Sequence, residues 1–265
     1  MNYLFVSLVL TIGLLASFGC SNYKPLKYKA VNDEVSPTYS PDKEAELIIS
    51  AYRVAIDSVM NISIGRAAHT LTKGTPEGSL GNFCSDAVYD RSIGWLQKED
   101  SLFNVIAVDF ALLNNGGLRV PLDSGEITIG NIYELMPFEN EIVLIELSGR
   151  KMIELIAYIQ NRTILQGRKS GVPVSTQFNL QLDTINDRVS CSINEQPFDS
   201  QRNYIIATSD YLATGGDQMT FFTEPIKIIN TNVKIRDALI GAIQEIENNG
   251  KQVSNKIDGR ISYAR

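Results

Sequence analysis

Residues 104–119 have the sequence NVIAVDFALLNNGGLR, and this stretch decides the fold class. Its first ten residues are almost continuously apolar, which is typical of a strand that is covered on both faces. The six residues that follow, Asn114 to Arg119, hold a glycine pair between polar side chains. Loops of this kind, carried by a rigid scaffold, are where binding groups concentrate. The stretch therefore predicts a buried strand that leads directly into a candidate binding loop.

Helical and extended segments interleave on both sides of this strand. Apolar residues at helical spacing predict helices, and shorter apolar or alternating runs predict strands. The expected helices cover residues 40–60, 80–96, 127–136, 149–160 and 233–248; the expected strands cover residues 62–71, 141–148, 175–182, 188–193, 203–210, 225–233 and 258–264. There is no strict βαβ alternation, so we expect an α+β (mixed α/β) fold with mixed sheets, forming a single domain over residues 43–265.

Two helices carry specific packing expectations. The helix that begins at Ser40-Pro41 has an apolar stripe that includes Leu47 and Val54, and we expect this stripe to pack on a sheet. In the 80–96 helix, Trp95 continues the stripe of Leu80, Phe83 and Cys84, which predicts that Trp95 belongs to the core.

The N-terminal segment predicts export. Residues 1–19 contain no charge, and Leu4 to Phe18 is mostly apolar but short for a membrane span, which needs roughly 20 residues. A small residue, Gly19, directly precedes Cys20, so we expect a bacterial lipoprotein signal over 1–19, with Cys20 lipidated on the periplasmic or cell-surface side of a membrane. An ordinary cleaved signal and a retained anchor are the alternatives. Residues 20–42, polar and rich in proline, are expected to be a flexible tether.

Composition excludes some functional classes. The formal net charge is −6, and Lys and Arg are scattered along the chain, which argues against a protein that binds nucleic acid polymers. The chain has one histidine, His69, and no HxH or HExxH pattern, so the usual dinuclear metal site of phosphoesterases is not expected here. Cys84 and Cys191 are far apart in sequence and are expected to be lone thiols, with a disulfide as the alternative.

Three segments hold the candidate ligand contacts. Asn114 to Arg119 offers backbone amides and a guanidinium suited to phosphate, although a plain turn with Arg119 in a salt bridge is an alternative. Phe138, in the turn at 136–140, is either a core plug or a stacking surface. Tyr211 and Asp217, in YLATGGDQMTFF at 211–222, offer a ring and a carboxylate, or form only a hairpin turn. Together these groups are what a nucleotide requires: rings for the base, a carboxylate for the ribose and an arginine for the phosphate.

Four motifs in this order resemble the C-terminal domain of the 5'-nucleotidase and UDP-sugar hydrolase family. They are LGNFCSDA at 80–87, NNGGLR at 114–119, PFEN at 137–140 and YLATGGDQ at 211–218. The resemblance covers about residues 60–265 and implies a four-layer α/β/β/α domain. It also implies that Phe138 and Tyr211 sandwich a base, that Asp217 contacts the ribose, that Asn140 contacts the base, and that Asn114 and Arg119 lie near the phosphate.

The sequence departs from this family at two places. Residues 75–78, Thr-Pro-Glu-Gly, stand where the family carries an arginine, which puts the phosphate contact there in question. No residues resemble the metallophosphoesterase domain that supplies two metals and the catalytic histidine in the family. We therefore expect no catalytic residue and no cofactor in this chain, with divalent metals held by a partner metallophosphoesterase.

Three functional hypotheses remain open. The first is the substrate-binding half of a split 5'-nucleotidase, whose catalytic half is a separate polypeptide. The second is a stand-alone nucleotide-binding lipoprotein that scavenges or senses nucleotides. The third is a structural or interaction module that has lost ligand binding. Whether the chain takes part in hydrolysis is left open by the sequence.

Overall fold

The computed structural model describes residues 40–98, 106–164, 170–183, 185 and 188–263. The expectations for residues 1–39, which include the signal peptide, Cys20 and most of the tether, fall outside this set. Within the described residues, no helix is both long and apolar enough to cross a membrane. From Ile49 onward the chain forms one compact unit.

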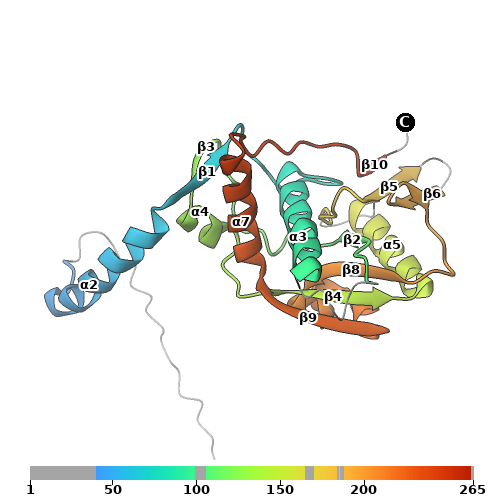
Figure 1. Cartoon of the computed structure of the whole chain (residues 1–265), viewed down its shortest axis with the longest axis horizontal. Coiled ribbons are helices and arrows are strands. Elements are labelled where there is room, and N and C mark those ends of the chain that lie inside the picture. The colour runs from blue at the N-terminus through green and yellow to red at the C-terminus, as the bar shows by residue number, and fades with distance from the viewer. Residues whose placement is uncertain (1–39, 99–105, 165–169, 184, 186–187, 264–265) are drawn as a thin grey trace, which may run out of the picture. The chain divides into compact units, whose positions relative to one another are not determined.

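A four-stranded mixed sheet lies at the centre of this unit (Figure 1). Its strand order is β2 (Phe110–Ala111), β8 (Tyr204–Ser209), β4 (Glu141–Leu147) and β9 (Lys227–Lys234). The β2 strand runs parallel to β8, whereas β4 is antiparallel to both β8 and β9. This arrangement brings the C-terminal ends of β2 and β8 to the same end of the sheet, next to the start of β4.

A second sheet has the order β10 (Ile261–Tyr263), β5 (Phe178–Asp183), β6 (Arg188–Ile193) and β7 (Gln196–Pro197). A third, small sheet pairs β1 (Ser63–Ala67) with β3 (Gly125–Thr128). Two helices, α3 (Ser79–Lys98) and α7 (Ile235–Asn248), lie side by side in Figure 1. The remaining helices are α2 (Lys43–Met60), α4 (Ile129–Leu135), α5 (Gly149–Ile164) and α6 (Asp210–Ala213), followed by short 3-10 turns at Gly216–Gln218 and Thr220–Phe222.

Two hydrophobic cores lie on opposite faces of the central sheet. The first joins the sheet to α3 and α7, and the second joins it to α5 and to the β5 and β6 strands. Consecutive residues around β2 alternate between them: Ala111 and Leu113 belong to the first core, and Phe110 and Leu112 to the second. A strand covered on both faces, in a mixed α/β fold with helical and sheet layers, was predicted, and both predictions are confirmed.

The buried strand is shorter than its apolar run. Leu112 still donates its N–H to Ala207 of β8, but the next donor, Leu113, bonds to Pro173, and Ser175 donates to Ala111. The chain thus leaves the central sheet and pairs with the 173–175 segment, so only Phe110–Ala111 form a regular strand. The apolar run indicates burial, and the residues after Ala111 stay buried although they no longer belong to a regular strand.

The expectation that the first helix packs on a sheet is wrong. The part of α2 that belongs to the compact unit is residues 49–60, and no residue of this part is buried or belongs to either core. The faces of the central sheet are already occupied by α3 and α7 on one side and by α5 and the second sheet on the other. By contrast, Trp95 packs against the first core as expected, though it is only partly buried.

The two cysteines of the described region are free thiols, as predicted. Cys84 lies in α3 and is fully buried, and burial raises its pKa far above the ordinary value. Cys191 lies in β6, where burial raises its pKa to about 12. Both side chains are therefore protonated packing groups at neutral pH.

Candidate functional site

One pocket of about 330 Å³ collects every ligand-contact residue that the sequence singled out. It is lined by Asn114, Gly116, Gly117, Arg119, Phe138, Asn140, Tyr211 and Asp217. The sheet explains the convergence. The loop at 114–119 leaves the end of β2, α6 leaves the end of the parallel neighbour β8, and the 136–140 loop enters β4, whose Ile142 pairs with Ser209 at the end of β8.

The Asp217 carboxylate is held by two side chains from different loops. Asn114 donates its amide Nδ2 to Asp217 Oδ2 at 2.6 Å, and the Tyr211 hydroxyl donates to Asp217 Oδ1 at 3.2 Å. A carboxylate offers about four acceptor sites, so each oxygen keeps capacity for a further donor. The Asp217 carboxylate therefore has a fixed orientation in the pocket and can still accept hydrogen bonds from a ligand.

The turn that carries Asp217 needs its glycines. Gly215 has φ 88°, and a Cβ on Gly216 would lie 2.5 Å from the ring of Tyr211, closer than any side chain could be tolerated. Asp217 itself has φ 52° and ψ 25°, in the left-handed region that a non-glycine residue seldom adopts. The backbone of the turn packs against the Tyr211 ring, which places Asp217 within reach of the Tyr211 hydroxyl.

Arg119 also lines the pocket and is exposed. Its backbone N–H donates to Leu135, its Nη1 donates to Gly116 O at 3.1 Å, and its guanidinium carbon lies 5.9 Å from the centre of the Phe138 ring. Among the residues described, no carboxylate forms an ion pair with it. The alternative in which Arg119 serves a salt bridge is therefore not what the structure contains.

The two pocket rings are surface groups, not core plugs. Phe138 is 44% exposed and Tyr211 is 45% exposed, whereas Phe110, Phe178 and Phe222 are fully buried. An exposed aromatic ring beside a cavity has one face free for stacking on a planar ligand.

A buried arginine that sequence analysis missed supports the Phe138 loop. Arg236 of α7 is 5% exposed and donates to Met136 O at 3.1 Å, to Phe138 O at 3.0 Å and to the Glu139 carboxylate. Its guanidinium also lies 3.9 Å from the centre of the Tyr133 ring. One signal could have found it, because Arg236 precedes Leu239 by three residues and Ile243 by seven, which puts it on the apolar stripe of the helix.

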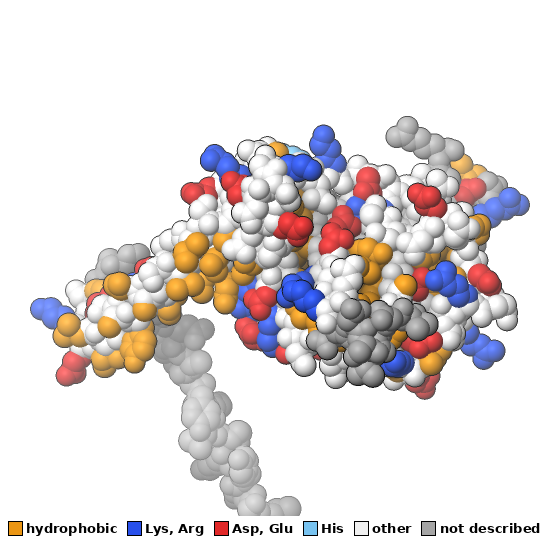
Figure 2. Space-filling model, viewed as in Figure 1, with side chains coloured by type: hydrophobic (Ala, Val, Ile, Leu, Met, Phe, Trp, Pro, Cys, Tyr) orange, Lys and Arg blue, Asp and Glu red, His pale blue; other side chains and the backbone are white. Residues whose placement is uncertain are grey.

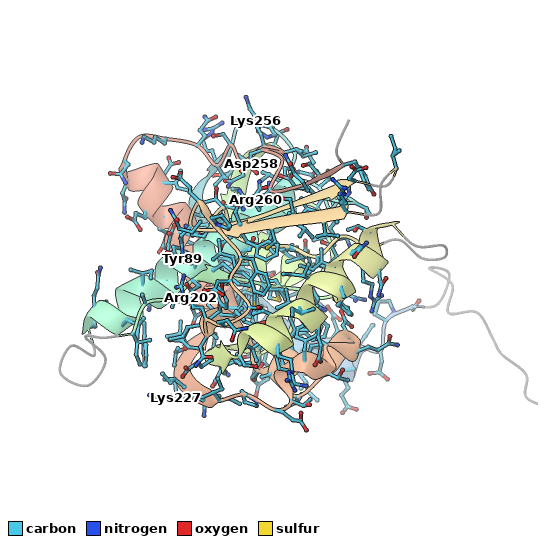
Figure 3. All side chains as sticks on the ribbon, turned by 90° about the vertical axis from the view of Figure 1, so that its right-hand side faces the viewer. Tyr89, Arg202, Lys227, Lys256, Asp258 and Arg260 are labelled. Atoms are coloured by element: carbon cyan, nitrogen blue, oxygen red, sulfur yellow. The ribbon has the colours of Figure 1, made fainter. Side chains whose placement is uncertain are left out.

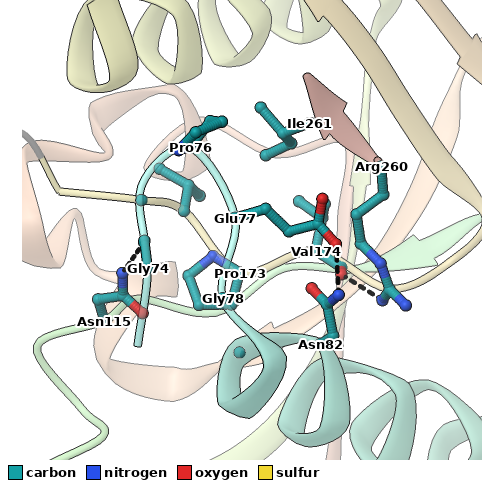
Figure 4. Close-up of a pocket in the computed structure, with 13 residues that line it drawn as sticks. Gly74, Pro76, Glu77, Gly78, Asn82, Asn115, Pro173, Val174, Arg260 and Ile261 are labelled. Carbon is teal, nitrogen blue, oxygen red and sulfur yellow. Dashed lines mark hydrogen bonds between the residues drawn. The ribbon is translucent and has the colours of Figure 1, made fainter. Parts of the chain in front are cut away.

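The segment at 74–78 has a structural role. Glu77 is 7% exposed; it accepts hydrogen bonds from the Asp258 N–H at 2.8 Å and the Gly259 N–H at 2.9 Å, and from the Asn82 amide. Figure 4 shows Glu77 directed at Asn82, with Arg260 beside them. The cavity there holds only about 10 Å³, about one water molecule at most. This segment offers no cation for a phosphate.

The structure describes no metal centre. Among the described residues, no three His, Cys, Asp or Glu side chains are grouped so that they could hold a metal ion. His69 lies just beyond β1, half-buried, with Nε2 3.1 Å from Asn255 O.

On the face drawn in Figure 2, acidic and basic side chains are interspersed, which is unlike the basic stripe of a nucleic-acid-binding surface.

Comparisons with known proteins agree with the motifs. The family model "5'-nucleotidase, C-terminal domain" matches residues 59–224. The "Trifunctional nucleotide phosphoesterase protein YfkN" of Bacillus subtilis is 24% identical over 236 residues, which cover 82% of this chain and 15% of that protein. Protein UshA of Yersinia enterocolitica is 31% identical over 111 residues, which cover 41% of this chain and 19% of that protein.

Among solved structures, the fold is similar to that of a 5'-nucleotidase precursor from Thermus thermophilus. That match has a TM-score of 0.64 at 23% identity and covers 84% of this chain and 43% of that one. NAD nucleotidase from Haemophilus influenzae matches with a TM-score of 0.61 at 14% identity, over 84% of this chain and 41% of that one. The chain thus spans less than half the length of these proteins. By its motifs, its fold and the family model that matches more than half of it, the chain belongs to the 5'-nucleotidase C-terminal domain family.

Proposed function

We propose that this chain is the nucleotide- or nucleoside-binding half of a split 5'-nucleotidase. The observation that carries the proposal is the convergence of two exposed rings, an oriented carboxylate and an arginine with no ion pair among the described residues on one pocket of about 330 Å³. Pockets for small ligands usually have volumes of roughly 300–1,000 Å³ and combine apolar walls with a few placed polar groups.

Each group has a chemical task in the proposal. The Phe138 and Tyr211 rings stack on the base, and Asn140 contacts its edge. Asp217 accepts hydrogen bonds from ribose hydroxyls, for which its two oxygens retain acceptor capacity. Arg119, together with Asn114 and the backbone of the glycine loop, lies toward the phosphate.

The proposal assigns phosphate-ester hydrolysis to a separate metallophosphoesterase polypeptide that carries the divalent metals. Two-metal phosphoesterases need several His and Asp ligands, and the chain has one histidine, which packs beside Asn255. The name of the Bacillus relative, a nucleotide phosphoesterase of which this chain matches 15%, supports a role within the same kind of reaction.

A calorimetric titration of the full chain tests the binding step. We expect adenosine, UMP or UDP-glucose to bind, and adenine and ribose 5-phosphate, which each carry only part of the ligand, to bind more weakly than a nucleotide. If neither adenosine, UMP nor UDP-glucose binds at millimolar concentration, the binding proposal is wrong and the chain is a structural or interaction module.

A pull-down followed by reconstitution tests the split arrangement. We expect a metallophosphoesterase to be captured by this chain, and phosphate release from a nucleotide to require both polypeptides together. Normal turnover by this chain alone, free of contaminating phosphatase, would reject a split enzyme. Nucleotide binding without any such partner would favour the second candidate, a stand-alone binding protein that scavenges or senses nucleotides.

The proposal includes export and a lipid anchor at Cys20. One relative, from Listeria monocytogenes, is named a cell wall protein and is 25% identical over 264 residues, which cover 89% of this chain and 32% of that protein. Labelling of the full chain in cells with an alkyne fatty acid is expected to mark the wild type and not a Cys20→Ser variant. Equal labelling of both would exclude Cys20 as the anchor.

A further inference from the structure

Two side chains outside the pocket hold the backbone of Asp217. Tyr158 and Arg162 lie one helical turn apart on α5, and neither lines the pocket of about 330 Å³. The Tyr158 hydroxyl donates to Asp217 O at 2.8 Å, and Arg162 Nη2 donates to the same oxygen at 3.0 Å. One carbonyl oxygen thus receives a neutral donor and a charged donor from the same helix.

The two donors also fix each other. Arg162 Nε donates to the Tyr158 hydroxyl at 3.0 Å, and the guanidinium carbon lies 5.2 Å from the centre of the Tyr158 ring. The Tyr158 ring packs edge-to-face on buried Phe221, with their centres 5.5 Å apart. Burial raises the pKa of Tyr158, so the phenol keeps the proton that it donates. The three hydrogen bonds form a closed network in which every donor has one acceptor.

This network acts on the part of the turn with the least favourable backbone. Asp217 has φ 52° and Gln218 has φ 67°, two successive non-glycine residues in the left-handed region. Such a conformation persists only where surrounding contacts determine it. The α5 helix supplies those contacts at the Asp217 carbonyl. The carboxylate of the same residue accepts hydrogen bonds from Asn114 and Tyr211 in the pocket.

We propose that Arg162 and Tyr158 are positioning residues that hold Asp217 in the left-handed conformation in which its carboxylate faces the pocket. Only the nature of the contacted ligand group, the ribose hydroxyls, rests on the proposed function. Arg162 itself touches no ligand in this proposal; it acts through Asp217.

The test measures the affinity of the full chain for adenosine and for 2',3'-dideoxyadenosine, which lacks the 2' and 3' hydroxyls. We expect Arg162→Ala to weaken adenosine binding about tenfold, as for a lost charged hydrogen bond, and to change dideoxyadenosine binding less than about twofold. Arg162→Lys, which keeps the charge, should recover part of the loss, and Tyr158→Phe, which keeps the ring on Phe221, should lose less than Arg162→Ala. Arg150→Ala, at an exposed position of the same helix, is the matched control and should change neither affinity.

Equal losses for both nucleosides in Arg162→Ala, or no loss, would overturn the proposal. A second readout does not depend on ligand: the amide hydrogen exchange of Asp217 and Gln218 should accelerate in Arg162→Ala, while that of β4 stays unchanged. Unaltered exchange in the turn would reject positioning even if nucleosides bind. Faster exchange in the turn, with no nucleoside bound by the wild type, would keep positioning and reject the nucleotide function.

Discussion

Two loops of this domain each present a carboxylate to an asparagine amide, and they use it for different purposes. In the loop at 74–78, Asn82 donates to Glu77, which also accepts two backbone N–H groups from Asp258 and Gly259 and is 7% exposed. In the turn at 215–218, Asn114 donates to Asp217, whose other intramolecular donor is the exposed Tyr211 hydroxyl. The first carboxylate is enclosed by the chain, and the second opens on a pocket.

The two carboxylates therefore have different roles: Glu77 stabilises the fold, whereas Asp217 is placed to contact a ligand. Glu77 ties α3 to the C-terminal segment, along which Lys256, Asp258 and Arg260 follow one another in Figure 3. Its two oxygens accept the Asp258 and Gly259 N–H groups, so removing Glu77 takes the acceptor from both backbone donors. The partners of Asp217 are exposed or half-exposed side chains that water can satisfy. Burial and the kind of donor, more than the motif, distinguish the two carboxylates.

The largest expected effect is on stability, in Glu77→Ala. Because the Asp258 and Gly259 N–H groups would lose their acceptor, we expect the free energy of unfolding to fall by about 3 kcal/mol, as measured by urea denaturation. Glu77→Gln, which keeps one carbonyl acceptor, should lose less. The comparison fails if Asp217→Ala, the matched change in the other loop, destabilises the domain as strongly as Glu77→Ala.

The next effect is on affinity, in Asp217→Ala. We expect nucleoside binding to weaken by about 1–3 kcal/mol, the range for a lost hydrogen bond to a charged group. Asp217→Asn is the better matched variant because asparagine tolerates the left-handed conformation and keeps the shape of the side chain. Calorimetry that gives wild-type affinity for both variants would show that the ligand binds elsewhere.

Tyr211 carries two separable contributions. Tyr211→Ala removes the ring and should weaken nucleoside affinity by about 1–3 kcal/mol, as for a lost base stack. Tyr211→Phe keeps the ring and removes the two long hydrogen bonds of the hydroxyl, one donated to Asp217 Oδ1 and one accepted from the Asp217 N–H, so we expect a loss of less than about 1 kcal/mol. If the phenylalanine variant lost as much as the alanine variant, the hydroxyl and not the ring would dominate binding.

The sequence predicted the pocket because its residues lie either next to a strand end or, as Arg119 and Asp217 do, further along a loop that leaves one. Asn114 follows the apolar run of β2, Tyr211 follows β8, and Phe138 and Asn140 precede β4. Short-range patterns locate such positions, and the mixed sheet then brings them to one edge. The six predicted residues line one pocket for this reason, although their contacts with a ligand stay predictions.

The supporting contacts could not be read from local patterns, since they join residues distant in the chain. Glu77 meets Asp258 and Gly259 from more than 180 residues away, and Arg236 meets Phe138 across 98 residues. The apolar stripe of α2 misled because periodicity predicts an amphipathic helix but does not specify what covers its apolar face. Pairing partners of this kind follow from the tertiary fold alone.

The smallest expected effect is the acid dependence of the Glu77 region. Burial opposes ionisation of Asp258, but the Arg260 guanidinium, which hydrogen-bonds it, holds its pKa below the ordinary value. A lowered native pKa stabilises the fold at pH values above the unfolded pKa of about 3.9, and this stability is lost as the pH falls through the native value. The Asp86 carboxylate also accepts a hydrogen bond from Arg260, but its pKa shift has the opposite sign. Burial raises the pKa of Asp86, so its contribution to stability is lost as the pH rises.

We therefore expect Asp258→Asn to flatten the fall in urea midpoint between about pH 4 and pH 2, and Asp86→Asn to steepen the fall at pH values just above about 4, between the unfolded pKa and the raised native pKa. The Asp258 side chain is 46% exposed, so the effect should be small and should shrink further in high salt. Parallel pH profiles for the wild type and Asp258→Asn would mean that Arg260 does not set the ionisation of this carboxylate. Nucleoside affinity should change in neither variant, because Asp258 and Asp86 do not line the pocket.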